Sequence, residues 1–346
     1  MRRREFLQAT IAAPIVAARR GGGATLVDRG FARVTRIADG VFATIAEPRR
    51  GLQCYSNGGV IAGRDALLIV EGHFQPEGAA LEIEIARTVS RSPIRGVVDT
   101  HYHLDHTFGN AGYASQQIQV LAHHETERLM RSAYARLSEE ARAAWLGPWE
   151  KRVAAARDRT DRARAAGDLE QMRWMGNAVD HATPAFPSEP LGPRDLPKTI
   201  DLGGLSVSID ARPGHSPTDL LIRVPDRGVV FTGDLFFNHA YPVVFDANVL
   251  AWRRVLDELA AFDKATQFIP GHGPIGGLNE IQENAAIMDG LRDHAERMMR
   301  AGVPVDEAER RYLVPHRFRG FEMLCWAFTV GGAMRNYYAA LRSAQA

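Results

Sequence analysis

The stretch His101-Tyr102-His103-Leu104-Asp105-His106 places three imidazoles and one carboxylate within six residues. It follows residues 96–99, a mainly apolar run that predicts a buried strand. Side chains two positions apart in an extended segment point the same way, so His101 and His103 can share one metal ion. The carboxylate and the third imidazole fall where the chain should turn into a helix, and we expect them to face a second ion. This mixture of nitrogen and oxygen ligands favours zinc or iron over calcium or magnesium.

Three further segments each place a ligand-type residue directly after a predicted strand. His215 follows a strand over 205–209, Asp234 follows a strand over 229–231, and His272 follows a short apolar run at 268–269. A histidine-rich surface loop would explain the first cluster alone. Independent strand ends that all carry metal ligands favour instead a site built by loops on a rigid scaffold.

The motifs HxHxDH, GH[ST], TGD and PGHG occur here in that order, and they resemble those of the metallo-β-lactamase-fold hydrolases. The resemblance covers about residues 31–277. It implies a first metal ion bound by His101, His103 and His215, and a second bound by Asp105, His106 and His272. As in glyoxalase II-like members, Asp234 would bridge the two ions.

One position departs from the pattern of that family. The family usually carries an Asp in a DTG-like turn after the third strand, where this chain has Glu71-Gly72-His73. We expect Glu71 to orient a metal ligand from behind, as outer carboxylates do. For His73 two readings stay open, a side chain that faces the site and, as the favoured one, a histidine on the surface.

The implied ligand set determines the expected chemistry. Two Zn²⁺ ions at about 3.5–4 Å would share a water, lower its pKa towards neutrality and hold hydroxide as the nucleophile. Asp105 is the expected catalytic residue, which orients that nucleophile or takes its proton. True β-lactamases of this fold generally lack a bridging aspartate, so Asp234 ranks a thioester, lactone or carboxylic ester above a β-lactam. Tyr241 is a candidate hydrogen-bond donor to the oxyanion, with a core or rim tyrosine as the alternative.

Two other classes of protein stay open. Iron is the alternative metal, in a mononuclear oxidoreductase that resembles the persulfide dioxygenases on this fold. That class would use the first ligand trio and leave His106 and His272 without a role. A non-catalytic metal-binding protein is the third class, but the complete ligand set argues against it.

The N-terminus resembles a twin-arginine export signal. Arg3-Arg4-Glu5-Phe6-Leu7 contains the arginine pair, and a modest apolar stretch over 10–18 ends in small residues suited to cleavage. We therefore expect residues 1–23 to be a signal and linker, and the protein to be periplasmic or otherwise exported. An unprocessed basic tail is the alternative. No run is long and apolar enough to span a membrane permanently.

Composition gives mainly exclusions. The formal net charge of +1 over 346 residues offers no argument for nucleic acid or an anionic membrane as partner. The expected partner, from the hydrolase chemistry, is a small-molecule substrate. Cys54 and Cys325 are the two cysteines, which excludes a disulfide scaffold and leaves open one bridge between them.

Alternating strand pairs and covering helices predict an α/β fold, a four-layer αββα sandwich with the ligand loops along one edge. We expect the sandwich to comprise residues 24–122 and 194–278. Residues 123–193 should form a helical insertion, and its tryptophans and methionines indicate either a cap that forms one wall of the substrate pocket, a dimer contact, or simple packing on the core.

Residues 279–346 should form a helical C-terminal extension. Its last helix is expected over 321–341, interrupted at Gly331-Gly332. We expect this aromatic helix to pack on the sandwich or in a homodimer interface, with the lining of an apolar pocket as the alternative.

Overall fold

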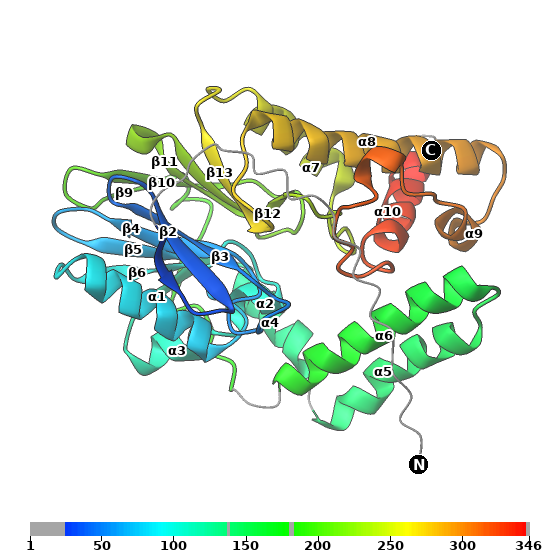
Figure 1. Cartoon of the computed structure of the whole chain (residues 1–346), viewed down its shortest axis with the longest axis horizontal. Coiled ribbons are helices and arrows are strands. Elements are labelled where there is room, and N and C mark those ends of the chain that lie inside the picture. The colour runs from blue at the N-terminus through cyan, green and yellow to red at the C-terminus, as the bar shows by residue number, and fades with distance from the viewer. Residues whose placement is uncertain (1–24, 137–138, 180–182, 344–346) are drawn as a thin grey trace, which may run out of the picture.

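The computed structural model describes residues 25–136, 139–179 and 183–343. Two β-sheets pack face to face, and helices cover the outer face of each (Figure 1). The predicted αββα sandwich is therefore confirmed. The export signal and linker expected over 1–23 lie outside the described residues.

The first sheet has eight strands in sequence order. They are β1 (Thr25–Asp28), β2 (Ala32–Ala38), β3 (Val41–Ala46), β4 (Gly58–Ala62), β5 (Leu67–Val70), β6 (Ile94–Val98), β7 (Val120–His123) and β8 (Glu189–Leu191). The second sheet has five strands, ordered β13 (Gln267–His272), β12 (Val229–Phe237), β11 (Leu220–Val224), β10 (Ser206–Ala211) and β9 (Lys198–Asp201). Apolar side chains from the facing sides of both sheets, such as Leu68 and Ile222, form the central core.

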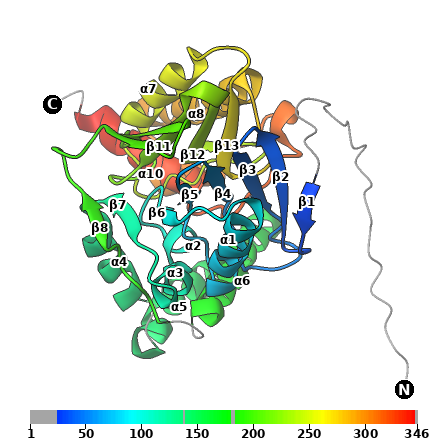
Figure 2. The same ribbon diagram turned by 90° about the vertical axis from the view of Figure 1, so that its left-hand side faces the viewer.

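The outer layers differ in thickness. The first sheet is covered by α1 (Pro76–Val89) and α3 (Asn110–Ser115), whereas the second is covered by α7 (Val249–Ala260), α8 (Leu278–Arg300) and α10 (Val330–Ser343). Figure 2 shows these two helical layers on opposite sides of the sheets. Each helix packs through an apolar stripe, as α7 does with Trp252, Val255 and Leu259.

The insertion forms three helices, α4 (Thr126–Ala135), α5 (Glu139–Ala154) and α6 (Arg159–Val179). Its expected boundaries are wrong at both ends, because His123 ends strand β7 and residues 189–191 form strand β8 beside it. Strand β8 has three residues and contains Pro190, so it gives almost no sequence signal. Strand β8 is at the edge of the sheet, so the missing N–H of Pro190 costs no hydrogen bond between strands.

The insertion is joined to the C-terminal extension across the ligand edge of the sandwich. Asp168 of α6 accepts hydrogen bonds from the backbone N–H groups of Trp326 at 2.7 Å and Ala327 at 3.0 Å. Arg152 of α5 pairs with Glu309, which belongs to α9 (Val305–Arg310). The two appendages therefore support each other as well as the sandwich.

The last helix begins nine residues later than expected, at Val330 instead of residue 321. Residues 321–329 instead bond through their backbone to the loop after β12, for example from Val244 N–H to the Phe328 carbonyl at 2.8 Å. Gly331 and Gly332 lie in the first turn and do not interrupt the helix. A Cβ on Gly332 would lie 2.9 Å from the Val244 carbonyl carbon, so glycine there permits the close approach.

Two remaining expectations concern disulfides and membranes. Cys54 and Cys325 are both buried and both free, so the bridge left open by the sequence is not formed. Among the residues described, no helix is both long and apolar enough to cross a bilayer.

Candidate metal centre

All seven expected metal ligands lie at one edge of the sandwich. Residues 101–103 follow β6, His106 lies in the single-turn helix α2 (Leu104–Thr107), and His215 follows β10. Asp234 does not end its strand as expected. Strand β12 continues to Phe237 through an irregularity at Gly233, whose φ of +49° and contact with Thr100 exclude a Cβ. His272 is the last residue of β13.

The first ligand group is a trio of imidazoles with one carboxylate. His103 Nδ1 lies 2.9 Å from His101 Nε2 and 2.9 Å from His215 Nε2. Asp234 Oδ2 completes the group at 3.3 Å from His215 Nε2 and 3.9 Å from His101 Nε2. All four side chains are buried, so this nitrogen-rich group is largely shielded from solvent.

The second ligand group contains Asp105, His106 and His272. Asp105 Oδ2 lies 3.4 Å from His106 Nε2 and 3.2 Å from His272 Nε2. The other oxygen of Asp234 faces the same two nitrogens, with Oδ1 3.3 Å from His106 Nε2 and 3.4 Å from His272 Nε2. Asp234 therefore contacts both groups, one oxygen to each.

The residues present fit a pair of divalent cations. His106 Nε2 and Asp234 Oδ1 are buried and face each other, yet neither makes a hydrogen bond. Buried polar atoms without partners are costly unless a cation or water satisfies them. Within each group the ligand atoms lie within 4.8 Å of one another, and imidazole with carboxylate is a donor set that zinc accepts.

Hydrogen bonds from behind determine which nitrogen each histidine presents. Thr100 Oγ1 donates to Glu71 Oε2 at 2.7 Å, so it accepts from His101 Nδ1 at 3.1 Å. Glu71 Oε2 also accepts from His106 Nδ1 at 2.8 Å, and the Val243 carbonyl accepts from His215 Nδ1 at 3.0 Å. With each proton held on Nδ1, the lone pair of Nε2 points into the site. The structure thus places Glu71 where the sequence suggested.

Sequence reasoning missed Asp246. Its Oδ1 lies 3.3 Å from Nε2 of His103, the one histidine that faces the trio through Nδ1, and its Oδ2 accepts a 2.5 Å hydrogen bond from the Tyr102 hydroxyl. It lies in the loop after β12, outside any ligand motif. Only the fold brings it behind His103.

We expect Asp246→Ala to weaken metal binding at the first group by about 10- to 100-fold, because His103 would lose the carboxylate that orients its ring. Competition with a chromophoric chelator measures this change. Asp226→Ala on an exposed turn is the matched control and should leave the affinity unchanged. Equal affinities in both variants would show that Asp246 has no such role.

Nearby carboxylates raise the pKa of two imidazoles in the second ligand group, which favours their doubly protonated, cationic form when no ion is bound. Burial alone lowers the pKa of His272, but Asp234 and Asp105 together raise it to about 9. Burial likewise opposes the charge on His106, yet the carboxylates of Asp234 and Glu71 raise its pKa well above the usual range. His215 differs, because burial lowers its pKa to about 4.

Metal uptake by the second group should therefore release protons. An ion in this group must displace the proton from Nε2 of His272, so zinc affinity is expected to rise with pH up to the pKa of His272, about 9. Calorimetric titrations in buffers of different ionisation enthalpy count the protons released. An uptake without proton release at pH 7 would contradict this assignment.

Two other candidates from the sequence, His73 and Tyr241, do not face the ligand groups. His73 is fully buried, not on the surface, and it faces neither ligand group. Its Nε2 bonds Glu82 at 3.0 Å and its Nδ1 contacts the Ser56 carbonyl at 3.1 Å. Tyr241 is also buried, with its hydroxyl 3.3 Å from that of Tyr312 in the core formed with α8 and α10, so it does not reach the ligand groups.

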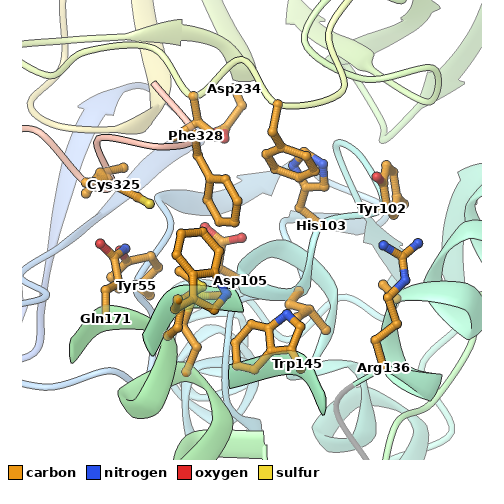
Figure 3. A pocket seen from close by; sticks show the side chains of 18 of the residues that line it. Tyr55, Tyr102, His103, Asp105, Arg136, Trp145, Gln171, Asp234, Cys325 and Phe328 are labelled. Atoms are coloured by element: carbon orange, nitrogen blue, oxygen red, sulfur yellow. The ribbon is translucent and has the colours of Figure 1, made fainter. Parts of the chain in front are cut away.

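A cavity of about 500 Å³ opens directly beside the ligands. His103, Asp105 and Asp234 contribute to its wall (Figure 3), and so does His272. The remaining wall is largely apolar and comes from α4, α5, α6, the loop after β12 and the segment before α10. The side chains that carry this character are Leu129, Trp145, Trp149, Met172, Met175, Phe245, Leu324 and Phe328. Helices of the insertion therefore form one wall of this cavity, and the segment before α10 contributes to the same wall.

The family model of the metallo-β-lactamase superfamily matches residues 51–272, which include every ligand. The chain belongs to the metallo-β-lactamase superfamily. The match contains the cap and ends before the C-terminal extension. The sequence resemblance is thus confirmed at the level of the superfamily.

Curated relatives match parts of the chain. A linear primary-alkylsulfatase from Pseudomonas sp. is 22% identical over 282 residues, which is 76% of this chain and 51% of the relative. An uncharacterized protein from Mycobacterium tuberculosis is 38% identical over 27% of this chain and 45% of its own length. The type 2 metallo-β-lactamase of Bacteroides fragilis is 31% identical over 25% of this chain and 39% of its own. The chain spans about half or less of these relatives.

Solved structures share the fold at low identity. A metallo-β-lactamase from Pontibacter korlensis aligns with a TM-score of 0.52 at 15% identity and covers 75% of this chain and 99% of its own. A sec-alkylsulfatase from Pseudomonas sp. aligns with a TM-score of 0.59 at 17% identity, over 89% of this chain and 50% of its own. These likenesses establish the sandwich and leave the substrate open.

Proposed function

We propose that this protein is an exported dinuclear zinc hydrolase that cleaves an ester-like bond in a small molecule, namely a thioester, a lactone or a carboxylic ester. The proposed ligand set is that of glyoxalase II-like members, with Asp234 shared between the two ions. Iron is the alternative metal.

The position of Asp234 carries the proposal. Its Oδ1 lies 3.3 Å from His106 Nε2 and its Oδ2 lies 3.3 Å from His215 Nε2, so one carboxylate faces both ligand groups. A pair of cations held by these residues would suit hydrolysis, because such ions could polarise the scissile bond and stabilise the leaving group. The names of two relatives, an alkylsulfatase and a metallo-β-lactamase, support hydrolysis in general.

Asp105 is the proposed catalytic residue. When bound, two divalent ions would lower the pKa of a water molecule and polarise the scissile bond. Asp105 borders the cavity, so its carboxylate is placed to orient the attacking water and accept its proton. Burial opposes its charge, but His106 and His272 hold the pKa of this carboxyl well below its usual range, which favours the ionised form that a cation would bind.

Tyr55, rather than Tyr241, is the proposed hydrogen-bond donor to the oxyanion. It lines the cavity, and its oxygen accepts a hydrogen bond from Gln171 Nε2 at 3.2 Å, which leaves the phenolic proton free for an oxygen of the substrate. Burial, with Asp105 nearby, raises the pKa of Tyr55 above its usual range, so it remains a donor. Tyr55 sits outside every ligand motif, which is why the sequence did not single it out.

Tyr55→Phe is expected to lower kcat by about 100-fold, the usual cost of one oxyanion donor, while metal content stays unchanged. Tyr338→Phe, which removes a hydroxyl bonded to the Val303 carbonyl away from the cavity, is the control. A variant with wild-type kcat would remove Tyr55 from the mechanism.

A hydrolysis panel tests the function. The purified protein is stripped with a chelator, reloaded with zinc, and offered a thioester, a lactone, a carboxylic ester, an alkyl sulfate and a β-lactam. We expect turnover of one of the first three, lost on chelation and restored by zinc. Turnover of the β-lactam alone, or of no member of the panel, would contradict the proposed substrate class.

Export is proposed on the N-terminal sequence alone. Replacing the arginine pair by Arg3→Lys and Arg4→Lys should retain the protein in the cytoplasm of a host with a twin-arginine system. Fractionation of the wild type and the double variant measures this. Equal periplasmic delivery of the two would contradict a twin-arginine route.

A further inference from the structure

The cavity beside the ligands has an apolar side that begins at the first ligand group. The ring of His103 lies 4.7 Å from that of Phe245, which lies 5.0 Å from Phe328, which lies 5.3 Å from Trp149. These rings come from the loop after β12, the segment before α10, and cap helix α5. A substrate group that leaves the ligands in this direction meets an aromatic wall and so must itself be apolar.

The cavity also contains a cation that the ligand groups do not use. Arg136 follows α4 and lines the cavity. In the described part of the chain its guanidinium contacts Ser132 Oγ at 3.3 Å and pairs with no carboxylate. Figure 3 shows it beside Tyr102, on the side of the cavity opposite Tyr55 and Gln171.

The acidic side chains in and behind the cavity wall already have other partners. Asp105 and Asp234 belong to the ligand groups, and Asp246, behind the wall, is bonded to Tyr102 and faces His103. Among the side chains that the structure describes, Arg136 therefore has no carboxylate partner, and its charge is available to a ligand. A guanidinium prefers an oxyanion, which it can bind through two parallel N–H groups.

We infer that the substrate of this centre is an anionic amphiphile. Its bulky aliphatic or aromatic group packs against the wall of Trp149, Phe245 and Phe328, and Arg136 binds its carboxylate or sulfate group. That this ligand is a substrate rests on the proposed hydrolase function. Its binding can be measured without turnover.

Binding of four small probes to the zinc-loaded protein tests the inference. Octanoate and octyl sulfate carry both features, 1-octanol carries only the chain, and acetate carries only the charge. Titration calorimetry should give the tightest binding for octanoate or octyl sulfate, and the preferred one of these identifies the anion. Octanol or acetate binding as tightly as both octyl anions would overturn the inference.

Variants of the arginine separate its role from the charge of the metal ions. Arg136→Met should weaken binding of the octyl anions by about tenfold or more, the usual cost of a charge-assisted hydrogen bond, and leave octanol binding unchanged. Arg136→Lys should retain part of the affinity. Arg128→Met, at an exposed position of α4 and paired with Glu125, is the matched control. Equal losses in Arg136→Met and Arg128→Met would overturn the assignment.

The outcomes also separate this inference from the hydrolase proposal. Anion binding that depends on Arg136 without hydrolysis of any ester would refute the hydrolase and retain the ligand class. Ester hydrolysis together with anion binding that Arg136→Met does not change would retain the hydrolase and refute the ligand class.

Discussion

Asp234→Asn should reduce hydrolysis on the order of a thousandfold or more and lower the metal content of the protein. The amide keeps the size of the side chain, and this matters because a Cβ placed on Gly271 would lie only 1.8 Å from Asp234 Oδ1, which shows how little space surrounds it. The substitution Asp234→Asn removes the negative charge that faces both ligand groups. It also replaces one carboxylate oxygen by an amide NH2 group, which cannot bind a cation.

Two measurements test this prediction. Plasma mass spectrometry gives the metal content of the variant, and kcat/KM on the best panel substrate gives its activity. Asp226→Asn on an exposed turn is the matched control. Full metal content with near wild-type turnover in Asp234→Asn would mean that the two groups do not share this carboxylate.

His272→Ala should remove one metal equivalent and most of the hydrolysis. The second group would retain only Asp105, His106 and one oxygen of Asp234, while the trio of His101, His103 and His215 stays complete. The ring of His272 also packs on Phe237 at 5.4 Å, so the variant leaves a cavity. His272→Asn, which fills part of that space, separates loss of the ligand from loss of packing.

The same variant discriminates between the two enzyme classes. His316→Ala, at an exposed position, is its control. A mononuclear oxidoreductase needs only the first trio, so activity unchanged by His272→Ala in a protein that holds one iron would favour that class over the dinuclear hydrolase.

The layers of the fold and the seven candidate ligands were predictable from the sequence for a local reason. The HxHxDH motif begins just after a predicted strand, and His215, Asp234 and His272 each lie within a few residues of a strand end. Strand ends at one edge of a sandwich converge. Glu71 was within reach as well, because it stands at a position where the family has a supporting carboxylate.

The rest of the site depends on contacts between distant segments. Asp246 and Tyr55 stand in loops with no motif, and only the packing of the two sheets brings them to the ligands. Tyr241 stands seven residues after Asp234 in the sequence, yet the loop after β12 turns it into the core beside Tyr312. For residues 321–329, composition favoured a helix, but backbone bonds to the loop after β12 outweigh that preference.

The metal content of the purified protein tests the central claim most directly. Plasma mass spectrometry of the protein as isolated, and again after reloading, gives the number and identity of ions per chain. The dinuclear assignment predicts about two zinc ions per chain, with Asp234 required for both. One iron ion per chain, unchanged on reloading with zinc and accompanied by no hydrolysis, would contradict it.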